Sequence, residues 1–163
     1  IWKKYLPSMS LEPTSAMCLF LNDGNTLEKS WNEPMYDLKN MEFTPTFWGA
    51  FDNTKLIGVN SGHMTLNRLY RSRGLFVFPE YRGFAIGQKL LMKTIAQAIH
   101  EKAIVCWSYP KKTAERSYHS QHFQSRGHSF NFQYEGDNIR AVKIFDERGL
   151  VDCLNPKIKK QLP

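Results

Sequence analysis

The sequence predicts an α/β (α+β) fold in which a mixed, mostly antiparallel sheet is flanked by helices. Two observations lead to this prediction. Short runs rich in aromatic and β-branched residues are separated by turn residues, which is typical of strands. Between these runs, one segment repeats its apolar residues at helical spacing, at Ile86, Leu90, Leu91, Thr94, Ile95, Ala98 and Ile99. With 163 residues and 42% apolar content, the chain is expected to form one domain over residues 1–163.

The expected order of elements is antiparallel strands, a helix, a strand, a helix and a closing hairpin. The strands are expected at residues 47–51, 56–66, 71–78, 103–107, 129–134 and 139–145, and the helices at residues 86–101 and 114–122. Residues 14–21 fit either a short helix that Pro13 opens or a buried strand, because periodicity does not separate the two.

Net charge and the content of cysteine and histidine narrow the kinds of ligand, cell compartment and metal site that the chain is expected to have. The net charge of +7 favours an anionic ligand, although it also suits nucleic acid or a solvated basic surface. The three cysteines, Cys18, Cys106 and Cys153, are widely spaced, which predicts reduced thiols in a cytoplasmic protein. The histidines do not pair at metal-ligand spacings, so no metal site is expected. No apolar run is long enough for a transmembrane helix, and no signal-peptide core follows Ile1.

The loop before the expected helix is the most informative part of the chain. An apolar strand ends at Pro79, small residues follow at Gly83, Ala85 and Gly87, and the helix begins there. Small side chains let backbone N–H groups approach one anion, and a helix N-terminus adds unpaired donors and partial positive charge. The pattern therefore predicts a pyrophosphate cradle. The chain has neither a P-loop nor a Rossmann fingerprint to compete with this reading.

Residues 82–87 fit the pattern Arg/Gln-x-x-Gly/Ala-x-Gly/Ala, and the upstream string Val-x-Pro-Glu-Tyr-Arg ends at Arg82. This segment closely resembles the acyl-coenzyme A motif of the GNAT superfamily of N-acetyltransferases. The resemblance covers about residues 47–147 and implies the acyl-CoA N-acyltransferase fold, with acetyl-CoA as cofactor. It implies that the cofactor lies against Leu75, Phe76, Val77, Arg82, Gly83, Phe84, Ala85, Ile86, Gly87 and Gln88. The one departure is Ala85, where Gly is commonest.

A second motif carries the implied chemistry. Family members often show Ala-x-x-Phe-Tyr-x-x-x-Gly-Phe, and residues 114–123 match it with Ser117 for Phe and His122 for Gly. His tolerates the positive φ that this Gly position usually needs. The resemblance implies that Tyr118 is the acid that protonates the departing thiolate. A core Tyr with a bonded hydroxyl is the alternative.

The base is less evident. Many relatives carry a Glu on the strand before the first motif, but residues 70–73 read Tyr-Arg-Ser-Arg. His63 on the preceding strand has a suitable intrinsic pKa, whereas a structural His, deprotonation through water, or an already neutral amine are alternatives.

The function expected from the resemblance is acetyl transfer from acetyl-CoA to an amine by direct attack. The acceptor would be a small-molecule or peptidyl amine, and Arg68, Arg71 and Arg73 would suit one that carries an anionic group. The alternative is a GNAT-fold module that binds coenzyme A or nucleic acid with little or no turnover. Nucleic acid is not the favoured partner and no membrane partner is expected. The sequence does not decide the oligomeric state, and it is compatible with a homodimer.

Overall fold

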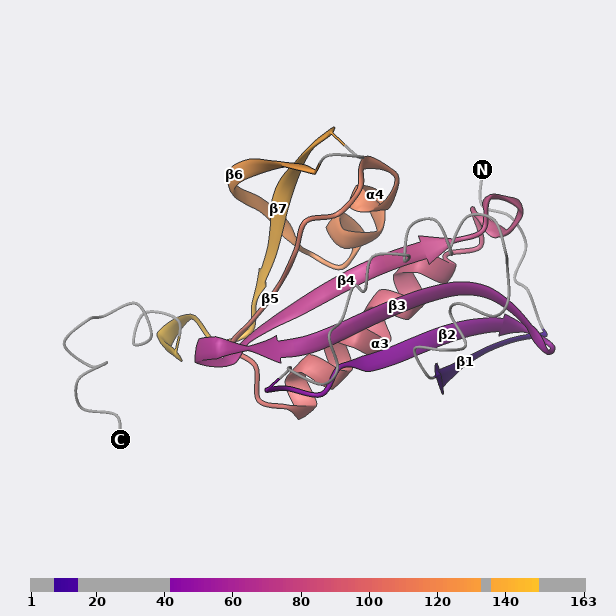
Figure 1. Ribbon diagram of the computed structural model, residues 1–163, viewed down its shortest axis with the longest axis horizontal. Helices are drawn as coiled ribbons and strands as arrows, with labels where there is room; N and C mark the ends of the chain where they lie inside the picture. The colour runs from indigo at the N-terminus through magenta and orange to yellow at the C-terminus, as the bar shows by residue number, and fades with distance from the viewer. Residues whose placement is uncertain (1–7, 15–41, 133–135, 150–163) are drawn as a thin grey trace.

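The computed structural model describes residues 8–14, 42–132 and 136–149, which include one seven-stranded sheet and two α-helices of 15 and 9 residues (Figure 1). The strands are β1 (Met9–Thr14), β2 (Thr46–Asp52), β3 (Lys55–Thr65), β4 (Leu69–Val77), β5 (Val105–Ser108), β6 (Gln124–Phe132) and β7 (Gly136–Ile144). The helices are α3 (Ile86–His100) and α4 (Lys112–Ser120), with 3-10 turns at Leu66–Arg68 and Pro79–Tyr81.

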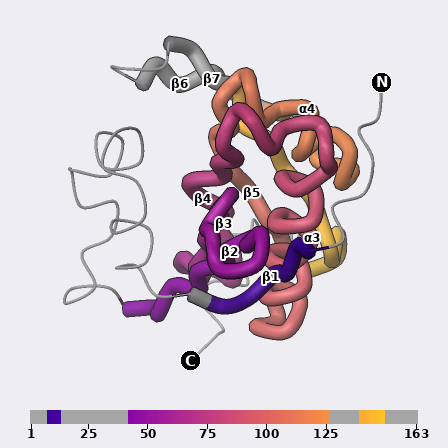
Figure 2. Tube along the Cα trace, turned by 90° about the vertical axis from the view of Figure 1, so that its right-hand side faces the viewer, coloured from indigo at the N-terminus to yellow at the C-terminus, as the bar shows by residue number. Residues whose placement is uncertain are grey.

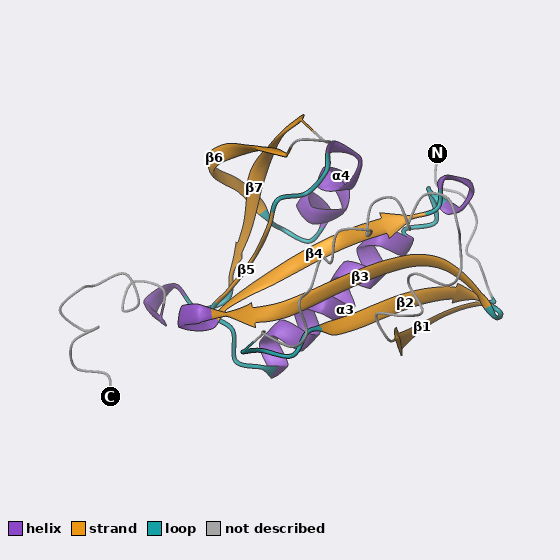
Figure 3. Ribbon diagram, viewed as in Figure 1, coloured by secondary structure: helices purple, strands orange, loops and turns teal. Residues whose placement is uncertain are grey.

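The strand order is β1-β2-β3-β4-β5-β7-β6, and every neighbouring pair is antiparallel except β4 and β5 (Figure 3). The mixed, mostly antiparallel sheet flanked by helices that the sequence predicts is thereby confirmed. The strand–helix–strand connection through α3 is what makes β4 and β5 parallel, since a crossover returns the chain in the same direction.

Helix α3 packs on one face of β2, β3 and β4, and α4 lies on the same side (Figure 2). Of the periodic residues of α3, Ile99 is exposed, and the other six are buried: Ile86, Leu90, Leu91, Thr94, Ile95 and Ala98. Leu91, Ile95 and Ala98 join a core that includes Met64, Tyr70 and Tyr118, whereas Ile86 and Leu90 pack with Ala50 and Ile57. Burial of this amphipathic face, more than intrinsic helix propensity, stabilises a helix of this length.

The parallel strands β4 and β5 diverge from a short region of pairing. Only Leu69, Tyr70 and Arg71 of β4 pair with β5, although β4 continues to Val77 (Figure 1). Strand β4 also carries a bulge against β3, because the register passes from Ser61↔Arg73 to Val59↔Phe76. Gly74, within this bulge, has a φ of 81°, which glycine adopts without steric cost. The divergence opens the sheet on the β5 side of β4.

Two differences from the sequence-based expectation concern edge strands. Strand β1 was not expected, because Pro13 normally argues against a central strand; it is tolerated here at the sheet edge. Strand β6 begins at Gln124, earlier than the expected start at residue 129. The sequence does not indicate the earlier start, because residues 124–128 are polar and show no alternation. Most of residues 14–21 lies outside the described part of the chain.

Candidate active site

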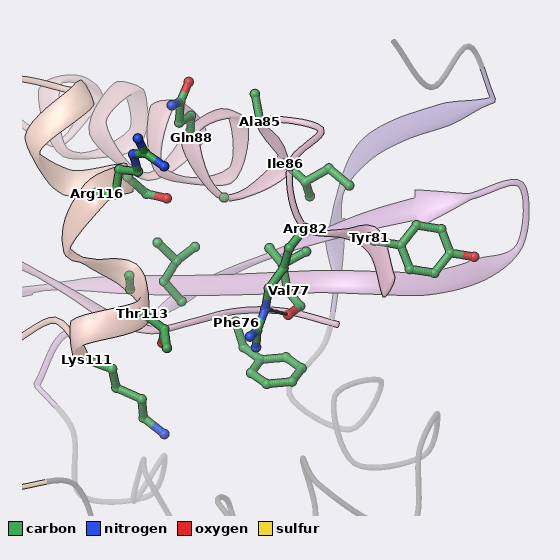
Figure 4. Close-up of a pocket in the computed structure, with 15 residues that line it drawn as sticks. Phe76, Val77, Tyr81, Arg82, Ala85, Ile86, Gln88, Lys111, Thr113 and Arg116 are labelled. Carbon is green, nitrogen blue, oxygen red and sulfur yellow. Dashed lines mark hydrogen bonds between the residues drawn. The ribbon is translucent and has the colours of Figure 1, made fainter. Parts of the chain in front are cut away.

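A cavity of about 580 Å³ lies where β4 diverges from β5, at the N-terminus of α3 (Figure 4). Figure 4 shows that three elements enclose it: β4 with Phe76 and Val77, α3 with Gln88, and α4 with Thr113 and Arg116. Leu75 and Ala114 add apolar surface. The cavity therefore has an apolar wall from the strand and a polar end formed by two helices.

The polar end is built from the loop that precedes α3. Gly83 and Ala85 have φ values of 89° and 60°, so the chain turns sharply into the helix at these two residues. Ala85 is the N-cap residue and offers no side-chain cap to the first-turn N–H groups. The backbone N–H groups of Ile86, Gly87 and Gln88 therefore have no side-chain cap, and they lie at the helix end that faces the cavity. Ala85 keeps the left-handed conformation that glycine adopts more easily, so this departure leaves the cradle intact.

The cavity fits a cofactor with an anionic end. Gly87 faces α4 so closely that an added Cβ would lie 2.9 Å from Ser117 Oγ. Three cationic side chains, those of Arg82, Lys111 and Arg116, line the cavity, whereas none of its lining residues is acidic. A helix N-terminus with basic neighbours attracts phosphate. The narrow passage at Gly87 would be filled by any larger side chain.

Arg82 is fixed across the end of β4. Its Nε donates to the carbonyl oxygen of Val77 at 2.9 Å, and its guanidinium lies 5.8 Å from the centre of the Phe76 ring. The side chain is exposed along this path, so part of its hydrogen-bonding capacity faces solvent. It thereby ties the turn to the strand and places a positive charge at the cavity mouth.

The structure brings together almost all of the residues that the resemblance assigns to the cofactor. Each of them except Phe84 lines the cavity, and Phe84 instead packs beside Ile86 and Leu90. The sequence-based set omitted the residues that come from the turn and from α4: Tyr81, Lys111, Thr113, Ala114, Arg116 and Ser117. Lys111 belongs to the basic pair at residues 111–112, and Ala114 and Ser117 belong to the second motif, so both features were available as signals.

Tyr118 does not line the cavity. It is 1% exposed and packs edge-on against Phe123, with ring centres 5.0 Å apart. Its hydroxyl lies 2.8 Å from Ser72 Oγ. Ser72 follows Arg71, the last β4 residue that pairs with β5, so the Tyr118 hydroxyl lies at the point where the two strands diverge. The prediction that His122 takes a positive φ at the end of α4 is confirmed, with φ 64°.

His63 lies on the other face of the sheet. Its neighbour Met64 packs in the α3 core, so alternation places His63 opposite. Burial holds the pKa of His63 below the usual 6.5, the Met64 carbonyl opposes that shift, and the charges of Arg71 and Arg73 add to it. Nδ1 lies 3.0 Å from the Met64 carbonyl, so it carries the proton of the neutral ring and Nε2 carries the lone pair.

Three further observations apply to the described residues. Cys106 is a free, buried thiol, and burial raises its pKa to about 12; Cys18 and Cys153 lie outside the described ranges. Within residues 8–14, 42–132 and 136–149, no group of three or more His, Cys, Asp or Glu is placed to hold a metal ion. No helix in these ranges has the length and apolarity needed to cross a membrane.

Comparison with known proteins agrees with this geometry. The family model "Acetyltransferase (GNAT) family" matches residues 17–130, more than half of the chain. The chain therefore belongs to the GNAT acetyltransferase family. Comparison with curated protein sequences gives no significant match.

Solved structures resemble the chain at low identity. A GNAT-family acetyltransferase of Staphylococcus aureus Mu50 has a TM-score of 0.63 and 19% identity, covering 85% of this chain and 99% of its own. YncA of Salmonella typhimurium, solved with its cofactor acetyl-CoA, has a TM-score of 0.63 and 15% identity, covering 86% and 95%. The PaiA N-acetyltransferase of Thermoplasma acidophilum, solved with coenzyme A, has a TM-score of 0.51 and 21% identity, covering 74% and 72%. Structures of this family thus include complexes with acetyl-CoA and coenzyme A, which supports acetyl-CoA as the cofactor here.

Proposed function

We propose that this chain transfers an acetyl group from acetyl-CoA to an amine. The observation that carries the proposal is the cavity between β4 and α4, which has the N-terminus of α3 at one end and three cationic side chains in its lining. When bound, acetyl-CoA supplies an acetyl thioester whose carbonyl carbon the amine attacks.

The chain's own residues divide the work of binding. The first-turn N–H groups of α3 hold the pyrophosphate, and Arg82, Lys111 and Arg116 attract it. The apolar wall of Leu75, Phe76 and Val77 excludes water from the reacting end. A backbone N–H near Val77 stabilises the oxygen on which negative charge develops, as in an oxyanion hole.

Two proton transfers complete the proposed chemistry. Tyr118 carries a proton on its phenolic oxygen and gives this proton to the departing sulfur. His63 takes a proton from the amine at Nε2, with solvent as the alternative acceptor. Support for Tyr118 comes from its hydroxyl, which lies where β4 and β5 diverge. For His63, support comes from its neutral tautomer and its depressed pKa.

The acceptor is proposed to carry a carboxylate or phosphate. Arg71 and Arg73 lie opposite His63 and Ser61 on β4, so they share the sheet face of His63. The Arg71 guanidinium lies 4.9 Å from the centre of the Trp107 ring, which fixes one cation beside an aromatic surface. An amine panel in pairs, with and without the anionic group, tests this preference. Equal kcat/KM within the pairs contradicts the anionic acceptor but leaves acetyl transfer standing.

A module that binds coenzyme A or nucleic acid without turnover is the second candidate. It is favoured by the cavity lining, which contains no carboxylate that could act as a base. Binding of single- and double-stranded nucleic acid at several salt concentrations separates this reading, since phosphate contacts weaken steeply with salt. Strong, salt-dependent binding with no acetylated product favours the module.

A further inference from the structure

A buried chain of polar side chains connects α3 to Tyr118 through two strands. Asn60 Nδ2 donates to Thr94 Oγ1 at 2.8 Å and to Ser72 Oγ at 3.1 Å. Ser72 Oγ in turn lies 2.8 Å from the Tyr118 hydroxyl. Asn60, Ser72 and Thr94 are all 0% exposed, so bulk solvent does not reach their polar atoms. Each proton in this chain must therefore find its acceptor within the protein.

The orientation of the Asn60 amide follows from its neighbours. In the observed orientation both N–H groups are used, and only Oδ1 lacks a partner. The flipped amide would leave two buried donors without acceptors, which is the costlier arrangement. Thr94 accepts from Asn60 and directs its own proton to the carbonyl oxygen of Leu90 at 3.3 Å. Asn60 consequently acts as a donor toward Ser72.

The direction of the next hydrogen bond follows from this one. Ser72 Oγ accepts from Asn60, and the hydroxyl must still place its own proton. Among the described residues, the acceptor in contact with Ser72 Oγ is the Tyr118 oxygen. If Tyr118 donated instead, the Ser72 proton would be buried without a partner. The contacts therefore make Ser72 the donor and Tyr118 the acceptor.

We propose that Asn60 and Ser72 are positioning residues that prepare Tyr118 to release its proton. The inference rests on the acid role of Tyr118 proposed above. Because Ser72 is the donor, the hydrogen bond between the two side chains contains the Ser72 proton, and the phenolic proton of Tyr118 is not part of it. When Tyr118 gives that proton to the departing sulfur, its O–H bond breaks, an S–H bond forms, and the Ser72 hydroxyl stabilises the negative oxygen.

The first test uses the free protein and needs no variant at Ser72. The infrared C–O stretch of ¹³C-labelled tyrosine distinguishes a phenol that accepts a hydrogen bond from one that donates. Subtracting the spectrum of Tyr118→Phe isolates the Tyr118 band. We expect the band of a phenol that accepts a hydrogen bond. The band of a phenol that only donates overturns the proposal, whatever the enzymatic activity.

The second test is a double-mutant cycle in kcat. Ser72→Ala should lower kcat about 10-fold, the weight of one hydrogen bond to a charged group, with KM for acetyl-CoA little changed. In the Tyr118→Phe background, Ser72→Ala should have no further effect, because Ser72 acts through Tyr118. Thr65→Val is the matched control: it removes a hydroxyl that joins the same strands through the carbonyl of Leu69, and kcat should stay at the wild-type value.

The outcomes distinguish the positioning role of Ser72 from the acid role of Tyr118. Equal losses from Ser72→Ala in both backgrounds, or an unchanged kcat in the single variant, overturn the positioning role alone. If Tyr118→Phe itself turns over at the wild-type rate, the proposed acid role fails. In that case the positioning role fails with it, while acetyl transfer is still decided by product formation.

Discussion

Gly87 on α3 lies against Ser117 on α4: a Cβ built on Gly87 would stand 2.9 Å from Ser117 Oγ. The two helices therefore lie close together where the backbone donors of α3 face the cavity. Helix α3 can present its N-terminus to an anion here only while residue 87 has no side chain of its own in the passage.

Gly87→Glu should weaken acetyl-CoA binding at least ~10-fold, which is about 1.4 kcal/mol. The variant places both bulk and negative charge beside the proposed pyrophosphate site. Calorimetric titration with acetyl-CoA measures the effect. Gly87→Gln has the same size without the charge, so the difference between the two variants isolates electrostatic repulsion. Unchanged affinity in a folded Gly87→Glu protein would contradict the placement of the cradle.

Arg116→Ala should weaken acetyl-CoA binding about 2- to 5-fold, since an exposed ionic contact contributes ~0.4–1 kcal/mol. The loss should shrink as salt is added, because exposed charges are screened. Titrations at low and high ionic strength check both statements. Arg148→Ala, a charge removed from an exposed residue outside the cavity lining, is the control and should leave the affinity unchanged.

Tyr118→Phe should lower kcat about 100-fold, the usual weight of one acid–base group, and leave acetyl-CoA affinity nearly intact. Steady-state kinetics and calorimetry separate the two quantities. The hydroxyl is buried against Ser72 and does not line the cavity, so loss of affinity is not expected. A wild-type rate would make Tyr118 structural and assign the proton to Ser117 or to water.

If His63 is the base, the activity of the wild type should rise with pH and reach its plateau at a pH below about 6.5. A base acts when it is deprotonated, and burial together with Arg71 and Arg73 moves its pKa below the usual value. In His63→Gln the rate should instead keep rising toward the pKa of the amine. Profiles with the same shape in both proteins would exclude His63.

His63 should also link stability to pH without any substrate. Its pKa in the folded state is depressed, so the unfolded chain binds the proton more readily. The stability that depends on neutral His63 is present above the unfolded value of about 6.5 and is lost as the pH falls through the folded value. Urea unfolding across this range should therefore show a steeper loss for wild type than for His63→Gln. Parallel curves would contradict the buried environment of the imidazole.

Patterns local in sequence predicted most of the fold. The 3.6-residue period gives α3 to within one residue at its C-terminal end, and the turn at residues 52–55 places the first hairpin. The bulge at Gly74 was not predicted, since a glycine within a strand run has several meanings. Neither was strand β1, in which Pro13 is compatible only with an edge.

The candidate site was predictable on its α3 side and not on its α4 side. A Gly-rich turn before a helix has a local physical meaning, so residues 82–88 could be read directly. Lys111 and Arg116 enter the same cavity only because β5 returns parallel to β4, which is a tertiary relationship. The contact between Ser72 and Tyr118 likewise joins residues 46 positions apart, and no local pattern indicates it.

Acetyl transfer itself is the central claim, and single-turnover product analysis tests it most directly. The protein is mixed with acetyl-CoA and the amine panel, and free coenzyme A and acetylated amine are quantified together by mass spectrometry. At least one amine should become N-acetylated, with one coenzyme A released per product, and Gly87→Glu should lower both at least ~10-fold when acetyl-CoA is well below its Kd. Tight binding of acetyl-CoA with no acetylated amine from any member of the panel would contradict it.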